Sequence, residues 1–320
     1  MNGPNESREA NAMLTVVVPA YNEEDAIAPA LRGLLPLAAQ HNWAVLVVND
    51  GSIDRTGETA AAIPGVKTIS HTVNRGYGAA LKTGIINART PWVALFDADG
   101  QHDPADLERL VEAAAGFDMI VGQRGRNSHQ EWVRKPGKWL LSKAANFLTG
   151  RKIPDLNSGL RVIRRDIIRD LLHLMPDGFS FSTTSTVAFL NLGFDVGYLP
   201  IRTRKRVGKS QVKQLKHGSN TILLIIRLIL LFNPLKVFLP ACLFLFASGT
   251  AYEILYGILW SPRHVRLIPG AFFALVTAIL VFFMGLLVDQ ISSLRKSLHF
   301  EKLMRARTGM PQPDMDTPGH

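Results

Sequence analysis

The run Leu267–Val288 holds 22 residues and no charged side chain, and it constrains the fold more than any other part of the chain. A helix of about 20 apolar residues crosses the roughly 30 Å hydrocarbon core of a membrane. Helices buried in soluble proteins seldom stay uncharged for so long. Leu235–Trp260 is a second candidate, although Glu253 lies within it. The sequence therefore predicts two transmembrane helices, at residues 235–260 and 267–290.

The segments that flank these two spans are amphipathic or basic. We expect residues 216–234 to form an interfacial helix, because a mostly apolar stretch with Arg227 stops at the helix-breaking pair Asn233-Pro234. Residues 291–320 form a basic tail, while the connection between the spans carries only two arginines. This bias predicts a multi-pass membrane protein with both termini in the cytoplasm.

The first two thirds of the chain alternate between short apolar runs and helical patterns. The expected strands are Leu14–Pro19, Ala44–Asp50, Val66–Thr72, Trp92–Asp97, Asp118–Gly122 and Phe194–Pro200. Helices are expected near Glu23–Ala39, Thr56–Ala62, Tyr77–Ala88 and Pro104–Ala115. Continuous apolar strands suit a parallel sheet that is buried on both faces. Repeated βα units predict a doubly wound α/β domain over residues 13–215, less regular over 123–200, after a disordered N-terminus of residues 1–12.

The charge of the chain points to an anionic partner. The formal net charge is +10 and the pI is about 9.9, which favours nucleic acid, anionic lipid or a phosphorylated substrate. Two predicted spans and the lack of a recognised nucleic-acid-binding motif make nucleic acid the poorest of these fits. The single Cys242 excludes an internal disulfide and a cysteine-based zinc site.

Two carboxylates follow the fourth expected strand. Asp97 and Asp99 stand in the sequence Leu-Phe-Asp-Ala-Asp-Gly-Gln. Divalent cations take oxygen ligands, and in open α/β sheets ligands bind beyond the carboxyl ends of the strands. The pair therefore indicates a metal-held diphosphate, although two acids that merely solvate a turn would also explain it.

The ends of the neighbouring strands carry further polar groups. Residues Tyr21–Glu23 either form a nucleoside pocket or make a strand-to-helix turn that is capped by Asn22. Asp50 begins an Asp-Gly-Ser turn and is placed to accept a hydrogen bond from a base or ribose, although turn chemistry alone accounts for Asp-Gly. The segment His71–Lys82 has two glycines but lacks the order of a nucleotide-hydrolysing P-loop.

Four segments occur in order, each at an expected strand end: Pro-Ala-Tyr-Asn-Glu-Glu, Asn-Asp-Gly-Ser-x-Asp-x-Thr, Asn-Arg-Gly-Tyr-Gly-Ala-Ala-Leu and Asp-Ala-Asp-Gly-Gln. Together they make residues 14–215 resemble the family 2 glycosyltransferases with the GT-A fold. Within that family the chain is similar to the polyprenyl-phosphate glycosyltransferases, relatives of dolichol-phosphate mannose synthase. The two expected spans resemble the bacterial subgroup that glycosylates undecaprenyl phosphate, which implies a multi-pass protein of the cell inner (plasma) membrane with a cytoplasmic catalytic domain. Asn49 departs from the pattern, because many relatives carry Asp there, but donor binding is expected to survive with Asp50.

The resemblance implies a role for each matching position. The residues implied in nucleotide-sugar binding are Pro19, Tyr21, Glu23, Asp50 and Asp97, the last on the ribose and metal side. The implied ligands of Mg²⁺ or Mn²⁺ are Asp99 and Gln101, whose oxygens suit such ions. The implied acceptor-phosphate residues are Arg124, Arg134 and Arg206. The expected catalytic residues are Asp155, Arg206 and Asp99.

The acceptor side of the expected site is rich in cations and contains Asp155. The basic residues there are Arg124, Arg126, Arg134, Lys135, Arg161, Arg202, Arg204, Lys205, Arg206 and Lys209. They either hold a lipid phosphate or form a basic face attracted to anionic lipids. Asp155 matches a position proposed as the base, but a phosphate monoester with a second pKa near 6 is largely ionised at neutral pH. Orientation of the acceptor or of the metal site, or a capped turn, are alternative roles.

The expected function is inverting transfer of one sugar from a nucleotide sugar to a polyprenyl phosphate, undecaprenyl phosphate in particular, at the cytoplasmic membrane face. UDP-glucose and GDP-mannose are favoured as donors by their frequency in the family. The alternatives are a family 2 transferase with another lipid or glycan acceptor, and a non-catalytic nucleotide-binding membrane scaffold. The chain lacks the Gln-x-x-Arg-Trp of processive polysaccharide synthases. A homo-oligomer is expected from membrane-embedded relatives.

Overall fold

The computed structural model describes residues 12–125, 135–204, 217–260 and 269–308. The chain divides into two compact units, Met1–Thr221 and Ile222–His320. The described strands of the first unit are β1 Leu14–Ala20, β2 Ala44–Asn49, β3 Val66–Ser70, β4 Trp92–Leu95, β5 Met119–Arg124, β6 Arg161–Arg164 and β7 Val196–Ile201. Its main helices are α2 Glu24–Gln40, α3 Thr56–Ala61, α4 Tyr77–Asn87, α5 Pro104–Ala113, α6 Lys135–Thr149, α7 Arg165–Asp170 and α8 Phe181–Asn191.

The strands form a mostly parallel sheet with the order β3-β2-β1-β4-β6-β5-β7. The strands β1 to β4 run parallel, and β5 runs parallel to β7. The strand β6 is antiparallel to both of its neighbours. The prediction of an α/β domain with a mostly parallel sheet is therefore confirmed, and β1, β2 and β4 bring their carboxyl ends to one edge.

The region that we expected to be less regular contains β6, which the sequence did not predict. Its residues Arg161–Arg164 place only two apolar side chains between two arginines. Such a short run gives little periodicity. The strand forms because Val162 and Ile163 pair with β4 on one side and β5 on the other, so that both are fully buried.

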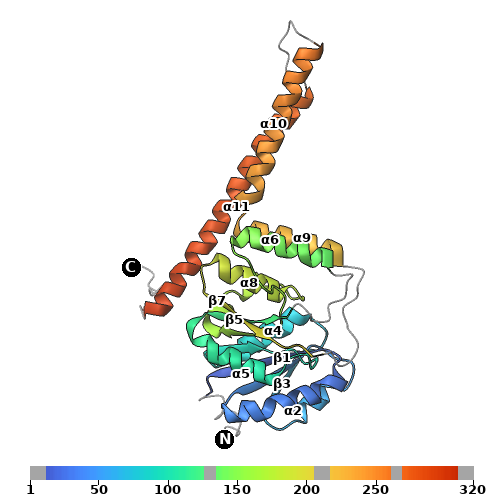
Figure 1. Ribbon diagram of the computed structural model, residues 1–320, viewed down its shortest axis with the longest axis vertical. Coiled ribbons are helices and arrows are strands. Elements are labelled where there is room, and N and C mark those ends of the chain that lie inside the picture. Colours follow the sequence, from blue (N-terminus) through green and yellow to red (C-terminus); the bar gives the residue numbers. More distant parts are fainter. Residues whose placement is uncertain (1–11, 126–134, 205–216, 261–268, 309–320) are drawn as a thin grey trace, which may run out of the picture. The chain divides into compact units, whose positions relative to one another are not determined.

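Helices cover both faces of the sheet, as Figure 1 shows for α2 and α8 on opposite sides. Side chains alternate along a strand, so neighbouring residues of β1 face different layers. Val16 and Val18 pack with Ile27 and Leu31 of α2 on one face. On the other face Val17 lies so close to α4 that Gly84 has no room for a Cβ, which would stand 2.2 Å from a Val17 methyl group.

The helix α5 begins at Pro104, as the sequence predicts. Asp103 caps this helix, because its side chain accepts a hydrogen bond from the backbone N–H of Ala105 at 3.2 Å. Pro104 occupies the first turn, where its missing N–H costs nothing. This helix start follows the Asp97–Gln101 segment directly, so it fixes the end of the turn beyond β4.

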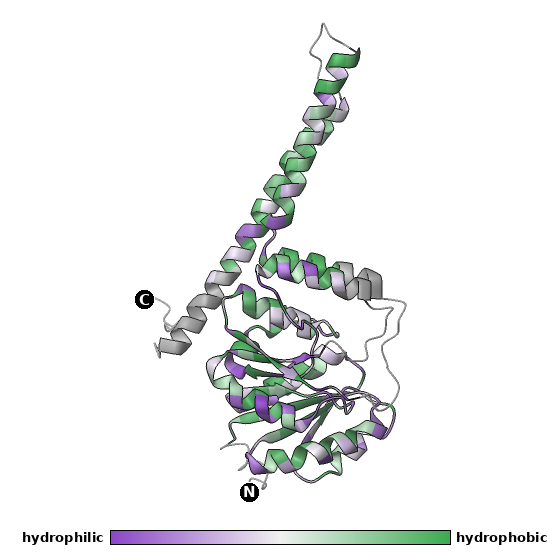
Figure 2. Ribbon diagram, viewed as in Figure 1, coloured by the Kyte–Doolittle hydropathy of each residue, from purple (hydrophilic) through white to green (hydrophobic). Residues whose placement is uncertain are grey.

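The second unit contains α10 Leu235–Trp260 and α11 Pro269–Thr308, preceded by α9 His217–Phe232. The helices α10 and α11 are apolar over most of their paired length, as Figure 2 shows. Leu235–Leu259 and Pro269–Leu294 are long and apolar enough to cross a membrane. They pack in antiparallel register, with Gly249 facing Ala274 and Gly285 facing Phe238.

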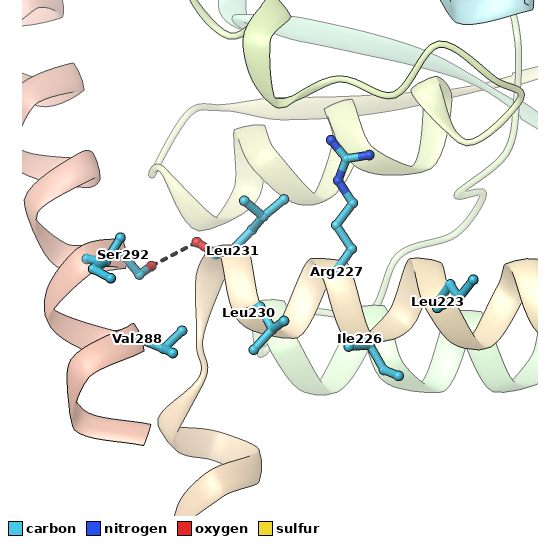
Figure 3. Close-up of a pocket in the computed structure, with 8 residues that line it drawn as sticks. Leu223, Ile226, Arg227, Leu230, Leu231, Val288 and Ser292 are labelled. Carbon is cyan, nitrogen blue, oxygen red and sulfur yellow. Dashed lines mark hydrogen bonds between the residues drawn. The ribbon is translucent and has the colours of Figure 1, made fainter. Parts of the chain in front are cut away.

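The helix α11 runs past the end that we expected for the second span. It continues to Thr308, so residues 291–308 of the expected basic tail belong to the same helix. Near the middle of α11, Ser292 donates a hydrogen bond to the backbone carbonyl of Leu231 at 2.8 Å, which ties α11 to the end of α9 (Figure 3). An open pocket of about 400 Å³ lies beside this contact. Its lining consists of Leu223, Ile226, Arg227, Leu230, Leu231, Val288, Ile291 and Ser292.

Candidate active site

A tight turn beyond β4 carries the two carboxylates that the sequence singled out. Asp99 is 9% exposed, and its Oδ1 accepts a hydrogen bond from the backbone N–H of Gln101 at 3.1 Å. Gly100 between them has a φ of +72°, which glycine adopts without steric cost. The turn therefore brings Asp97, Asp99 and Gln101 together at the carboxyl end of the strand.

Both oxygens of Asp97 are held by side chains, one from α4 and one from the same connection between β4 and α5. The Tyr77 hydroxyl donates to Oδ1 at 2.8 Å, and His102 Nε2 lies 3.2 Å from Oδ2. Burial alone would raise the pKa of Asp97, but the hydrogen bonds from His102 and Tyr77 outweigh it and hold that pKa below its ordinary value. Burial, followed by the charge of Asp97, raises the pKa of Tyr77 well above its ordinary value. Asp97 is therefore an ionised acceptor and Tyr77 a neutral donor.

Tyr77 and His102 are site residues that sequence reasoning did not single out. His102 directly follows the Asp-Ala-Asp-Gly-Gln motif, is 6% exposed and forms an isolated bridge with Thr203. Tyr77 lies inside the Asn-Arg-Gly-Tyr-Gly motif and is the first residue of α4. The only sequence signal for either residue was its place in or beside a motif.

The chemistry of this turn fits a hard divalent cation. Asp97 and Asp99 offer carboxylate oxygens and Gln101 an amide oxygen. Among the described residues no group of three or more His, Cys, Asp or Glu side chains is placed to hold a metal. A site with so few protein ligands suits Mg²⁺ or Mn²⁺ at a phosphate, because the remaining positions are filled by phosphate oxygens and water.

Asp50 is hydrogen-bonded to the loop that leads into α4. It is 2% exposed. Its carboxylate accepts hydrogen bonds from the backbone N–H groups of Arg75 at 3.0 Å and Gly76 at 2.8 Å, and it lies 2.6 Å from Nδ1 of His71. The expected contact of Asp50 with a nucleotide stays a prediction, and the structure gives this residue a second task, because it fixes the residues just before Tyr77.

The loops after β1 and β2 are tied together. Pro19 lies in β1 opposite Val48 of β2. Asn22 has a φ of +51°, and its side chain accepts a hydrogen bond from the backbone N–H of Ile53 at 3.0 Å. The interpretation of Asn22 as a helix cap is therefore wrong, because Glu23 is the cap residue of α2 and its side chain makes no capping bond. Tyr21 and Glu23 are half-buried beside this junction, and their contacts with a nucleotide stay predictions.

Arg124 and Asp155 form a bidentate ion pair. Arg124 donates from Nε at 2.8 Å and from Nη2 at 2.9 Å to the two carboxylate oxygens. Burial alone would raise the pKa of Asp155, but the hydrogen bonds and charge of Arg124 outweigh it and lower that pKa below its ordinary value. A carboxylate held in this way is a weak base. Arg134 and Arg206, the other expected phosphate residues, lie outside the described part of the chain.

Arg161 does not belong to the basic face that we expected. Its side chain is fully buried, and its guanidinium donates to the backbone oxygens of Ser158 and Ser182 and to the hydroxyls of Ser185 and Thr186. Burial lowers the pKa of Arg161 to about 10, so the side chain stays charged near neutral pH. It joins β6 to the first turns of α8.

Comparison with known proteins identifies the family. Residues 15–172 match Glycosyl transferase family 2, and residues 233–294 match the GtrB C-terminal hairpin. Polyprenol monophosphomannose synthase of Mycolicibacterium smegmatis is 35% identical over 225 residues, which are 64% of this chain and 81% of that protein. The chain belongs to glycosyl transferase family 2. This assignment confirms the resemblance drawn from the four motifs.

Other relatives of this family 2 chain match it over a shorter stretch. Undecaprenyl-phosphate 4-deoxy-4-formamido-L-arabinose transferase of Aeromonas hydrophila subsp. hydrophila is 38% identical over 169 residues, which are 50% of this chain and 51% of that protein. The chain thus spans about half the length of several curated relatives that it matches.

Solved structures with a similar fold are known. Glucosyl-3-phosphoglycerate synthase of Mycobacterium tuberculosis, crystallised with Mn²⁺, UDP-glucose and phosphoglyceric acid, superposes with a TM-score of 0.54 at 20% sequence identity. The superposition covers 70% of this chain and 81% of the other. At this identity the likeness shows the fold alone, which is the GT-A fold predicted from the sequence.

Proposed function

We propose that this family 2 chain transfers one sugar, with inversion, from a nucleotide sugar to a polyprenyl phosphate. The observation that carries the proposal is the turn of Asp97, Asp99 and Gln101 beyond β4, in which Tyr77 and His102 hold Asp97 ionised. Relatives named for polyprenol and undecaprenyl-phosphate transfer support the acceptor class. Undecaprenyl phosphate is the acceptor and UDP-glucose or GDP-mannose the donor that we favour.

The proposed chemistry is a single displacement. An oxygen of the acceptor phosphate attacks the anomeric carbon in line, and the nucleoside diphosphate leaves from the opposite face, so that an α-linked donor gives a β-linked product. A bound Mg²⁺ or Mn²⁺ ion would offset the charge that builds on the leaving diphosphate. Asp99 and Gln101 are the proposed ligands. The protein holds both reactants in place, which supplies much of the remaining rate.

The acceptor phosphate needs cations more than it needs a base. We assign Arg124 to that phosphate, with Arg134 and Arg206 as further proposed partners. Asp155 orients the Arg124 guanidinium through its two hydrogen bonds. This positioning role agrees with the lowered pKa of Asp155, and it agrees with a phosphate monoester that is already largely ionised at neutral pH.

A lipid acceptor places the reaction at a membrane surface. The helix α6 exposes Trp139, Leu140 and Phe147, with exposed fractions of 63%, 45% and 57%. The Lys143 ammonium lies 5.7 Å from the centre of the Trp139 ring. Large apolar side chains interleaved with a cation are typical of a helix that lies on anionic lipid. Together with the apolar helices α10 and α11, this face supports the proposal of a membrane-bound enzyme. The positive-inside bias of the sequence supports a cytoplasmic catalytic unit.

The test is glycolipid synthesis by the purified full chain. Protein in detergent is given undecaprenyl phosphate, Mg²⁺ or Mn²⁺, and a panel of nucleotide sugars, and the lipid product is identified by mass spectrometry. Asp99→Ala is expected to lower the rate at least a hundredfold, because it removes a charge from the metal site. Asp170→Ala, at an exposed carboxylate on α7, is the matched control and keeps the rate. Intact protein that makes no glycolipid from any donor contradicts the proposal.

A further inference from the structure

We propose that Phe179, carried on the ring of Tyr77, is a donor-contacting residue that packs against the transferred sugar and sets which sugars are accepted. The inference rests on the proposed function, because it needs a nucleotide-sugar diphosphate at the Asp97–Gln101 turn. Tyr77 acts as a positioning residue in this arrangement. It links the exposed ring of Phe179 to the carboxylate of Asp97.

The position of Tyr77 is fixed at both ends. Its hydroxyl donates to Asp97 at 2.8 Å. Its backbone follows Arg75 and Gly76, whose N–H groups are bound by the buried Asp50. The face of the Tyr77 ring stacks on Phe179, with 5.4 Å between ring centres and 17° between ring planes. A ring held at its hydroxyl, its backbone and one face is a rigid support.

The loop that carries Phe179 is anchored to the same helix. The backbone carbonyl of Asp177 accepts a hydrogen bond from Ala79 N at 3.1 Å, and its carboxylate pairs with Lys82 at 2.6 Å. The loop packs so closely on α4 that a Cβ at Gly78 would stand 2.2 Å from the carbonyl oxygen of Pro176. The Phe179 ring is therefore placed by the fold and does not sit on a loosely attached loop.

Phe179 is nevertheless 63% exposed. An aromatic ring beside a polar site loses hydrophobic stabilisation as long as it faces water, so its rigid placement there indicates a ligand that covers it. The part of the donor that lies next to the metal-held diphosphate is the sugar joined to it. One face of a pyranose ring presents C–H groups, and the negative face of an aromatic ring packs well on them. The nucleoside is expected farther away, at the ends of β1 and β2.

A binding experiment separates the sugar from the nucleotide. Titration calorimetry with the full chain and Mn²⁺ compares UDP-glucose with UDP, and GDP-mannose with GDP. Phe179→Ala is expected to weaken the affinity for the nucleotide sugar about five- to tenfold, which is the size of one aromatic contact. The affinity for the nucleoside diphosphate is expected to change less than twofold. Phe179→Tyr keeps the ring and is expected to stay within twofold of the wild type for both ligands. Activity assays of Phe179→Ala should also show altered ratios of kcat/KM across the donor panel.

Two controls keep the result specific. Ile86→Ala removes a 55% exposed apolar side chain at the far end of α4 and should change neither affinity. Tyr77→Phe keeps the stack but removes the hydroxyl that holds Asp97. It should therefore weaken the affinities for both ligands to the same extent. If Phe179→Ala loses equal affinity for the nucleotide sugar and the nucleoside diphosphate, or loses none, the inference is overturned while the proposed function stands. Wild-type protein that binds no nucleotide sugar overturns both.

Discussion

Four carboxylates of the candidate site look alike in the sequence but have different partners in the structure. Asp97 is held by Tyr77 of α4 and by the nearby His102, and Asp50 is enclosed by the loop before α4. Asp155 is bound to Arg124, while Asp99 closes its own turn. The partners of a side chain, more than its place in a motif, decide whether it binds a ligand or shapes the binding loop.

At the residue scale we predict that Asp155 is not the base. The rates of wild type and Asp155→Asn should depend on pH in the same way between about pH 6 and 8, because the pKa of Asp155 is lowered and the group is ionised throughout that range. The variant should lose about 1 to 3 kcal/mol of stability with its two charge-assisted hydrogen bonds. The stabilising contribution of Asp155 is complete above its ordinary pKa and falls away as the pH drops through its lower native pKa.

The measurements for Asp155 are a pH–rate profile and a chemical unfolding curve for each protein. An ionisation between pH 6 and 8 that is present in the wild type and missing in Asp155→Asn would establish Asp155 as the base. Arg164 and Asp166 form an exposed pair at 2.9 Å on the same unit. Asp166→Asn is therefore the matched control, and its stability should change by less than about 1 kcal/mol.

The sequence supplied the residues of the turn beyond β4, which we propose as the metal site, but not the partners of those residues. Asp97, Asp99 and Gln101 stand out because a buried strand ends in closely spaced oxygen ligands. The bond from Tyr77 to Asp97 joins residues 20 positions apart, and only the packing of α4 on β1 and β2 brings them together. The same limit hid the burial of Asp50, since its donors come from the loop after β3.

At the element scale Arg161 joins β6 to α8, and we predict that lysine does not replace it. A lysine keeps the charge but offers three donors from one atom, whereas the guanidinium reaches several acceptors with a planar fork. Arg161→Lys should lower the stability by about 2 kcal/mol or more. Arg164→Lys, on the same strand but partly exposed, should change it by less than about 1 kcal/mol. Unfolding midpoints in detergent compare the two, and equal losses would contradict this role.

We predict that a methyl group added at one glycine of the α10–α11 hairpin lowers its stability, and that a methyl group added at another does not. A Cβ at Gly285 would stand 2.6 Å from Cβ of Phe238, while a Cβ at Gly257 meets nothing within 4 Å. Gly285→Ala is expected to push the helices apart and lower the unfolding temperature by several degrees. Gly257→Ala should be neutral or slightly stabilising, because alanine favours helix. A larger loss at Gly257 would show that the hairpin packs differently.

Helices and strands could be predicted where their pattern of apolar residues is long, and they were missed where that pattern is short. The spans and the helices after β1, β3 and β4 carry many apolar residues in a regular period. The strand β6 carries two, and its existence depends on two neighbouring strands that leave a gap for it. The end of α11 was missed for another reason: its last residues are charged, and hydropathy marks where a membrane span ends but not where a helix ends.

At the scale of the whole molecule the proposed topology can be tested by cysteine labelling. In a Cys242→Ala background, Met13→Cys and Ser297→Cys should react with a membrane-impermeant maleimide only after cells are broken. His264→Cys, between the two spans in sequence, should react in intact cells. The charge bias of the chain gives this orientation. Labelling of Met13→Cys in intact cells would place the catalytic unit on the other side.

The unbroken course of α11 has a mechanical consequence. Its 40 residues make a rod of about 60 Å, of which the apolar segment Pro269–Leu294 takes the first 26. A single rod tilts as one body, so a change of 10° at the apolar end displaces the opposite tip by about 10 Å. Membranes of different thickness impose different tilts on the segments that cross them. The position of the far end of α11 would then depend on the thickness of the membrane around the apolar segment.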